Sequence, residues 1–258
     1  MGQKKEQRIG IFDSGIGGFS ILKEIHKSAP HLKAYYIADD AFAPYGSKSA
    51  DEIIQRSKYI VEELLKFDVE LIVVACNTAT AFAIDYLRDH YSVSFVGVEP
   101  FLNAIDKFNW TREDKSCVIT TELMSKSVRF NDLKLRYDKF NQLDYFVTKN
   151  LATIIEKYFS QLDKQELMAS LEDEFSIFDK SAYKYIILGC THYPLIGREI
   201  EAITGLAVIS PCPYVARRVV SLIGLDGNET AESSSFEFTT TKASSPLRFV
   251  SKDFSSLP

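Results

Sequence analysis

Strand-sized apolar runs alternate with helix-patterned segments along most of this chain, and this alternation constrains its fold more than any other feature. The runs are short and mostly apolar, which is typical of strands covered on both faces of a parallel sheet. They lie at 8–12, 34–38, 71–75, 94–98, 117–121 and 185–189. Apolar residues between several of them recur at helical spacing. The pattern predicts an open, mainly parallel, doubly wound α/β fold.

The later part of the chain is less regular. From about 131 to 178 the sequence is charged, and its apolar residues are mostly spaced as in helices. From 226 to 245 the composition shifts to Ser, Thr and Glu. A last apolar run at 247–250 predicts a further strand.

Two strand ends repeat one pattern, and the repeat indicates two domains. VVACNT at 73–78 and ILGCTH at 187–192 each place a cysteine after an apolar strand, with two polar residues and a helix pattern following. We expect one copy in each of two similar α/β domains. The first would comprise 1–97 plus 211–258, and the second 98–210. The expected crossings, near 97–101 and 209–213, both contain proline and turn residues.

Composition and charge exclude several classes of protein. Of the 258 residues 46% are hydrophobic and 25% are charged, as in globular proteins and unlike disordered or fibrous ones. Thirty Lys and Arg residues against 35 Asp and Glu residues give a net charge of −5, and the sequence contains no basic run. We therefore expect no nucleic-acid partner.

Hydrophobic segments and cysteines predict the compartment. The apolar runs fall far short of the roughly 20 residues that span a bilayer, so no membrane association is expected. The charged start at 1–8 does not read as a signal peptide. The four cysteines are widely spaced without a C-x-x-C pair, so neither a disulfide framework nor a metal site is expected. The sequence predicts a cytoplasmic protein with reduced thiols.

Two of the cysteines, Cys76 and Cys190, carry the functional signal. Strand ends in an open parallel sheet line the ligand crevice. A helix amino terminus favours the ionised thiol and lowers its pKa from about 8.5 towards neutrality. The Asn-Thr and Thr-His neighbours of these two residues are not needed for packing. Cys117, inside an apolar strand, and Cys212, between two prolines, are interpreted as inert.

A matched pair of thiols suits the inversion of a carbon centre. One group removes a proton from one face while an acid of similar pKa delivers a proton to the other face. Because the reaction runs in both directions, each group must serve as base and as acid. A redox pair would need the two sulfurs at bonding distance, whereas a racemase needs them separated by the width of a substrate.

Five motifs, in this order, resemble those of glutamate racemases within the broader aspartate/glutamate racemase group. They are GIFDSGIGG at 10–18, PYGSKS at 44–49, VACNTA at 74–79, GVEP at 97–100 and LGCTHYPL at 188–195. The resemblance covers most of the chain. It implies two α/β domains with the active site in the cleft between them, usually in a homodimer. It also implies cofactor-independent interconversion of L- and D-glutamate, which supplies D-glutamate for bacterial peptidoglycan.

The resemblance also implies roles for individual residues. Cys76 would deprotonate D-glutamate and Cys190 L-glutamate, with Asp13 assisting the first thiol and His192 the second. Asp13 could also accept from the substrate ammonium, although an aspartate at a strand end often caps a helix instead. The implied substrate contacts are Asp13, Ser14, Tyr45, Gly46, Asn77, Thr78, Thr121, Thr191 and His192.

Departures from the family pattern leave alternatives open. Met124 stands where the family usually places a threonine that helps hold the substrate, while Ser127 keeps the later match. The carboxylate that supports the family's histidine has no clear counterpart, and Asp144 and Glu156 are the candidates. The alternatives are a racemase of aspartate or another small amino acid, and a weakly catalytic member that acts as a protein-binding module.

Overall fold

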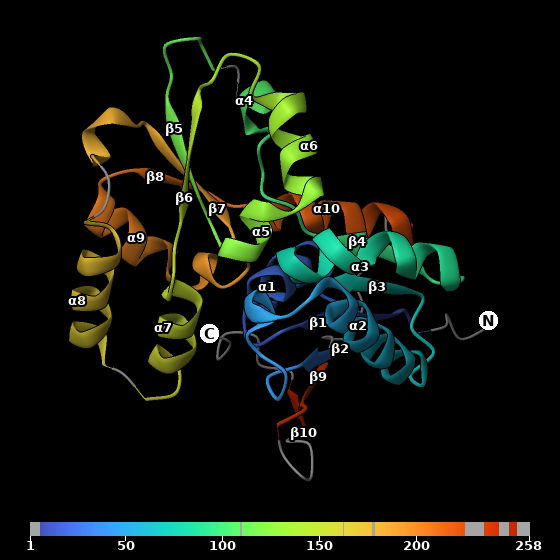
Figure 1. The fold of residues 1–258 in the computed structure, drawn as a ribbon. Coiled ribbons are helices and arrows are strands. Elements are labelled where there is room, and N and C mark those ends of the chain that lie inside the picture. The colour runs from blue at the N-terminus through green and yellow to red at the C-terminus, as the bar shows by residue number, and fades with distance from the viewer. Residues whose placement is uncertain are drawn as a thin grey trace. The chain divides into compact units, whose positions relative to one another are not determined.

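The computed structural model describes residues 6–108, 110–161, 163–176, 179–224, 235–242 and 248–251. The chain divides into two compact units, one comprising Met1–Val98 and Cys212–Pro258 and the other Glu99–Pro211. Each boundary lies one residue later than the sequence predicts. Each unit is built around a sheet of its own (Figure 1).

In the first unit the described residues form a six-stranded sheet in the order β10-β9-β2-β1-β3-β4. Neighbouring strands are parallel, except for the antiparallel pair of β9 and β10. The strands are β1 (Arg8–Asp13), β2 (Lys33–Ala38), β3 (Leu71–Val74), β4 (Ser94–Gly97), β9 (Phe236–Thr240) and β10 (Arg248–Ser251).

The helices of the first unit cover both faces of this sheet. They are α1 (Phe19–Ser28), α2 (Ala50–Leu65), α3 (Asn77–His90) and α10 (Cys212–Ile223), with a 3₁₀ turn η1 (Tyr45–Ser47). Helix α1 packs against α10, and α2 packs against α3. Because β1 lies between β2 and β3, right-handed crossovers place α1 on one face and α2 with α3 on the other.

In the second unit the described residues form a four-stranded parallel sheet in the order β6-β5-β7-β8. The strands are β5 (Ser116–Thr120), β6 (Leu143–Val147), β7 (Tyr185–Gly189) and β8 (Ala207–Ile209). The helices are α4 (Ala104–Lys107), α5 (Glu122–Lys126), α6 (Val128–Tyr137), α7 (Leu151–Tyr158), α8 (Lys164–Glu174) and α9 (Gly197–Thr204), with 3₁₀ turns η2 (Lys180–Ala182) and η3 (Tyr193–Ile196). Apolar side chains of β5, β7, α7, α8 and α9 form one core on one face of this sheet.

The prediction of two mainly parallel α/β domains is confirmed, and the structure adds two strands that the sequence did not predict. The segment expected to be mostly helical, 131–178, contains strand β6, whose edge position leaves it half-exposed and therefore less apolar than a central strand. The Ser-, Thr- and Glu-rich segment contains strand β9, which pairs with β2. The strand expected at 247–250 is β10, and residue 247 lies outside the described residues. Within the described part of the chain, no helix is both long and apolar enough to cross a lipid bilayer.

Candidate active site

The first cysteine turn lies at the carboxyl edge of the first sheet. Asp13 is the last residue of β1, and Cys76 follows the neighbouring strand β3. These strands are parallel, with Phe12 opposite Val74, and the Ala75 N–H donates to the Phe12 carbonyl at 2.8 Å. The register brings the two strand ends together, and the Cys76 Sγ lies 3.9 Å from the hydroxyl of Ser14.

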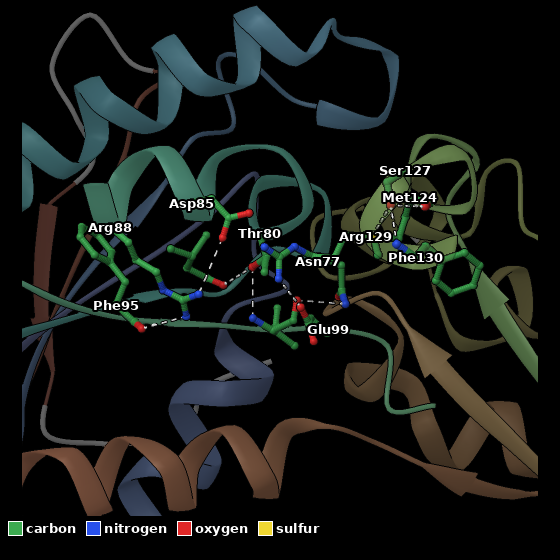
Figure 2. Close-up of polar contacts among 12 residues, drawn as sticks. Asn77, Thr80, Asp85, Arg88, Phe95, Glu99, Met124, Ser127, Arg129 and Phe130 are labelled. Atoms are coloured by element: carbon green, nitrogen blue, oxygen red, sulfur yellow. Dashed lines mark hydrogen bonds and ion pairs between the residues drawn. The ribbon is translucent and has the colours of Figure 1, made fainter. Parts of the chain in front are cut away.

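Cys76 is the N-cap residue of α3, so its thiol sits where the helix dipole and the first N–H groups favour an anion. It is 5% exposed, which is buried but not sealed. Thr80 fixes this turn, because its hydroxyl donates to the Val74 carbonyl and accepts from the Val98 N–H, each at 3.1 Å (Figure 2).

Asn77, next to the thiol, carries an unsatisfied acceptor. Its amide nitrogen donates to the Val98 carbonyl at 3.5 Å (Figure 2). Its Oδ1 is buried and has no hydrogen-bond partner among the residues that the structure describes. A buried acceptor without a donor carries a desolvation penalty, so a ligand N–H or O–H at this point would be stabilised. Thr78, the following residue, is also buried.

Asp13 is fully buried, and its Oδ2 accepts from the Gly18 N–H at 3.0 Å. Gly18 directly precedes α1, so this oxygen performs the capping task that the sequence left as an alternative for Asp13. Glycine at position 18 leaves room for Tyr36, since a Cβ there would lie 2.8 Å from the Tyr36 hydroxyl oxygen. The contact with Gly18 occupies one carboxylate oxygen of Asp13. The proposed contact of Asp13 with a substrate ammonium stays a prediction.

Tyr45 and Gly46 lie in the 3₁₀ turn that follows β2. The Tyr45 side chain is buried, and its hydroxyl donates to Oδ2 of Asp39 at 2.7 Å. Burial, followed by the charge of Asp39 and this hydrogen bond, raises the pKa of Tyr45 well above its usual value, and the charge of Cys76 adds to the rise. Tyr45 is therefore neutral and serves as a hydrogen-bond donor. Gly46 is exposed, with open space around it.

The second cysteine turn lies at the carboxyl edge of the second sheet. Strands β5 and β7 are neighbours with Thr120 opposite Gly189, so Thr121 and Cys190 follow two adjacent strand ends. Gly189 permits this approach, because a Cβ there would lie 2.7 Å from the Ile119 carbonyl oxygen. The Cys190 side chain is 8% exposed.

A hydrogen-bonded chain runs from this second thiol to a carboxylate. The Cys190 Sγ lies 3.7 Å from Nδ1 of His192, and Nε2 of His192 lies 2.7 Å from Oε1 of Glu156 on α7. Because a carboxylate accepts, Nε2 carries the proton and Nδ1 is left to exchange a proton with the thiol. Of the two carboxylates considered from sequence, Glu156 is the partner, whereas Asp144 accepts from the Tyr183 hydroxyl at 3.0 Å.

The two cysteine turns differ in one respect, because the repeat in the sequence predicts a helix directly after each cysteine and only the first turn has one. No α-helix begins at Cys190: the described chain continues into η3, which His192 directly precedes, and α9 starts only at Gly197. In an α-helical turn the N–H of residue 194 would donate to the Cys190 carbonyl, but Pro194 has no N–H. The helix-dipole argument therefore applies to Cys76, and Cys190 has an imidazole beside it instead.

Thr121 is another residue of the second unit that the sequence predicts to contact the substrate. It is the N-cap residue of α5, yet its Oγ1 is buried without a hydrogen-bond partner in the described part of the chain. Thr191 is buried beside Cys190. Ser127 is the N-cap of α6, where its hydroxyl donates to the Met124 carbonyl at 2.8 Å and accepts from the Phe130 N–H at 3.1 Å (Figure 2).

Comparison with known proteins identifies the family. The model of the Asp/Glu/hydantoin racemase family matches residues 17–219, which is most of the chain. The chain belongs to this family. It is an isomerase of the amino-acid racemase class, as the sequence motifs predict.

Individual relatives of this racemase agree with that assignment. A glutamate racemase of Herpetosiphon aurantiacus is 37% identical over 222 residues, covering 85% of this chain and 85% of that protein. The crystal structure of glutamate racemase isoform RacE1 from Bacillus anthracis has a TM-score of 0.77 at 27% identity, over 93% of this chain and 90% of that one. The glutamate racemase of Francisella tularensis in complex with D-glutamate has a TM-score of 0.71 at 26% identity, over 92% and 88%.

The other two cysteines of this racemase lie in packed surroundings. Cys117 is fully buried in the core of the second unit, and this burial raises the pKa of its thiol to about 12. Cys212 is buried at the start of α10, where its Sγ lies 3.3 Å from the Ser20 hydroxyl. Among the described residues, no three His, Cys, Asp or Glu side chains are placed to hold a metal ion.

The sequence interpretation left one site residue undecided and missed another. Glu156 was one of two candidates because no local signal marks a carboxylate that reaches a histidine 36 positions away. Asp39, which holds the Tyr45 hydroxyl, received no role. Its position directly after a buried strand is the same signal that marked Asp13, and it could have been used in the same way.

Proposed function

We propose that this racemase interconverts L- and D-glutamate by a two-base mechanism in which Cys76 and Cys190 act on opposite faces of the substrate Cα. One observation carries the proposal: each unit has a buried but not sealed thiol at the carboxyl edge of its parallel sheet, next to groups suited to proton transfer. The many named glutamate racemases among its relatives support glutamate as the substrate.

The proposed step is balanced in both directions. With D-glutamate, the Cys76 thiolate takes the Cα proton, the C–H bond breaks, and its electron pair stays on Cα. The Cys190 thiol then delivers its proton to the opposite face and becomes a thiolate, giving L-glutamate. The enzyme is left with Cys76 protonated and Cys190 ionised, which is the state that acts on L-glutamate in the reverse direction.

His192 and Glu156 provide a route for the proton of Cys190. Nδ1 of His192 can take the thiol proton, because Nε2 already donates to Glu156. The carboxylate stabilises the imidazolium that forms and holds the ring in the required tautomer. On the other thiol, the amino terminus of α3 and the neighbouring Ser14 hydroxyl favour the anion.

Substrate binding is proposed for buried polar groups that lack protein partners. Oδ1 of Asn77 and Oγ1 of Thr121 are such groups within the described residues. The backbone N–H groups of Tyr45 and Gly46 would bind a carboxylate, and Asp13 would accept from the ammonium. Of the remaining predicted contacts, Ser14 lies 3.9 Å from the Cys76 thiol in space. Thr78, Thr191 and His192 lie within two residues of Cys76 or Cys190 in the sequence.

The experiment follows L-glutamate in D₂O by circular dichroism, without added cofactor. The wild-type protein should lose optical activity and introduce deuterium at Cα. Cys76→Ala and Cys190→Ala should each abolish racemisation in both directions, whereas Cys212→Ala, which removes a buried thiol from a packed position, should keep it. Substantial two-way turnover by either of the first two variants would refute the two-thiol assignment.

Met124 is the reason to consider a second substrate, aspartate. A methionine replaces the hydroxyl that the family resemblance places there, and it is fully buried in α5. Aspartate, with one methylene less, is therefore the alternative. Comparison of kcat/KM for L-glutamate and L-aspartate decides between them, and turnover of neither acid would favour a protein-binding role.

The cellular role and assembly are proposed from the family resemblance alone. The enzyme would act in the cytoplasm as a homodimer and supply D-glutamate for peptidoglycan. Rescue of a bacterial strain that requires external D-glutamate tests the cellular role. Analytical ultracentrifugation tests the dimer.

A further inference from the structure

Asp39 lies at the centre of a buried hydrogen-bond network in the first unit. It directly follows β2, its side chain is fully buried, and its carboxylate accepts from side chains of three other segments. The donors are the Tyr45 hydroxyl at 2.7 Å, the Arg56 guanidinium at 2.6 and 2.5 Å, and the Thr241 hydroxyl at 2.7 Å. Its backbone N–H donates to the Asp13 carbonyl at 2.8 Å.

Arg56 fixes the plane of this carboxylate. Its Nε and Nη2 bind the two oxygens of Asp39 as a fork, the geometry that gives a guanidinium–carboxylate pair its directionality. A fully buried carboxylate needs such a counter-charge. With both oxygens oriented by α2, the Tyr45 hydroxyl has a fixed acceptor, and the 3₁₀ turn that carries Tyr45 and Gly46 is held against β2.

The third side-chain donor, Thr241, comes from the other end of the chain. It follows β9 and is joined to the 38–41 segment at several points. Its hydroxyl donates to Asp39 and accepts from the Ala41 N–H at 3.2 Å. Its own N–H lies 3.1 Å from both the Ala38 carbonyl and the Asp40 carboxylate. The end of β9 is thus fastened to the loop that leads to Tyr45.

We propose that Thr241 is a positioning residue for Tyr45, acting through Asp39. The segment after β9 would thereby set the geometry of the Tyr45–Gly46 turn, to which the proposed function assigns a substrate carboxylate. Thr241 touches neither thiol turn in any described contact, so its effect should appear in substrate binding and not in proton transfer. The inference rests on the proposed function.

Thr241→Val tests the inference, because it removes the hydroxyl and keeps the shape and β-branching of the side chain. We expect KM for both glutamate enantiomers to rise about fivefold, the factor that corresponds to one ordinary hydrogen bond, with kcat nearly unchanged. Thr241→Ser should restore the wild-type KM. Thr240→Val, one residue earlier, removes a hydroxyl that makes no side-chain hydrogen bond among the described residues, and it should leave KM unchanged.

A double-mutant cycle shows whether the effect passes through Tyr45. Tyr45→Phe removes the hydroxyl that Asp39 holds, so Thr241→Val should raise KM much less in that background than in the wild type. Equal effects in both backgrounds, or equal effects of Thr241→Val and Thr240→Val, would overturn the inference. Asp39→Asn should raise KM more than Thr241→Val does, and if it fails to fold the Thr241 series still decides.

Assays of the wild-type protein distinguish failure of this inference from failure of the proposed function. Wild-type racemisation of glutamate with a KM that Thr241→Val does not move would refute the inference alone. A wild-type protein that neither racemises glutamate nor binds it in a calorimeter would refute both.

Discussion

Replacement of Glu156 by glutamine isolates the charge that supports His192. The substitution keeps the size of the side chain and lets an amide oxygen accept from Nε2, but it removes the negative charge 2.7 Å from the ring. His192 is buried, whereas the Glu156 side chain is 37% exposed, so solvent screens part of the interaction. We expect loss of about 1–2 kcal/mol of transition-state stabilisation, roughly a 5- to 30-fold fall in kcat/KM.

Comparison of the two enantiomers shows which thiol Glu156 supports. Two enantiomers have equal free energy, so kcat/KM must fall equally for L- and D-glutamate, whichever thiol is impaired. The difference should appear in the primary isotope effect, measured with substrates deuterated at Cα. If Glu156 acts through Cys190, proton abstraction from L-glutamate becomes the slower step. The isotope effect on kcat/KM should then be larger for the L-enantiomer than for the D-enantiomer.

Asp144→Asn is the matched control, because Asp144 is the other carboxylate in this part of the sequence and binds Tyr183 instead. Its kcat/KM should stay within about twofold of the wild-type value, as for an exposed interaction. Equal losses in Glu156→Gln and Asp144→Asn would contradict the assignment. So would an isotope effect that is larger for D-glutamate, since that would connect Glu156 to Cys76.

Two further predictions concern the core and the second thiol turn. Because burial raises the pKa of Cys117 to about 12, its thiolate is disfavoured in the folded protein, and stability that is present below the unfolded thiol pKa of 9.0 should be lost as pH rises towards 12. Chemical denaturation should therefore show a smaller fall in unfolding free energy between pH 9 and 11 for Cys117→Val than for the wild type, and parallel curves would contradict this. Gly189→Ala would push a Cβ against the Ile119 carbonyl, and we expect about 1–3 kcal/mol of destabilisation and loss of racemisation because Cys190 follows directly. A thermal melt and the D₂O assay check this, and a variant with wild-type melting temperature and activity would show that the strand end can adjust.

The sequence predicts the elements whose chemistry is local. Central parallel strands such as β3 are apolar along their whole length because both faces are covered, so they stand out without any knowledge of their neighbours. Cys76 and Cys190 stand out because a polar pair follows each at a strand end. Strands β6 and β9 do not stand out, because β6 lies at a sheet edge and β9 is set among Ser, Thr and Glu residues.

Residues whose partners lie far away in the sequence cannot be predicted in this way. Glu156 becomes the partner of His192 only once α7 packs against the turn that follows β7, and nothing near Glu156 in the sequence encodes that packing. Thr241 meets Asp39 only because β9 pairs with β2 in one register, Ala38 opposite Thr240; a shift by one residue would turn its hydroxyl to the other face of the sheet. Strand register is set by the sum of many side-chain contacts along the pair. The role of a residue that depends on strand register can therefore be inferred from the folded structure but not from the sequence alone. The Thr241 variants test such a role directly.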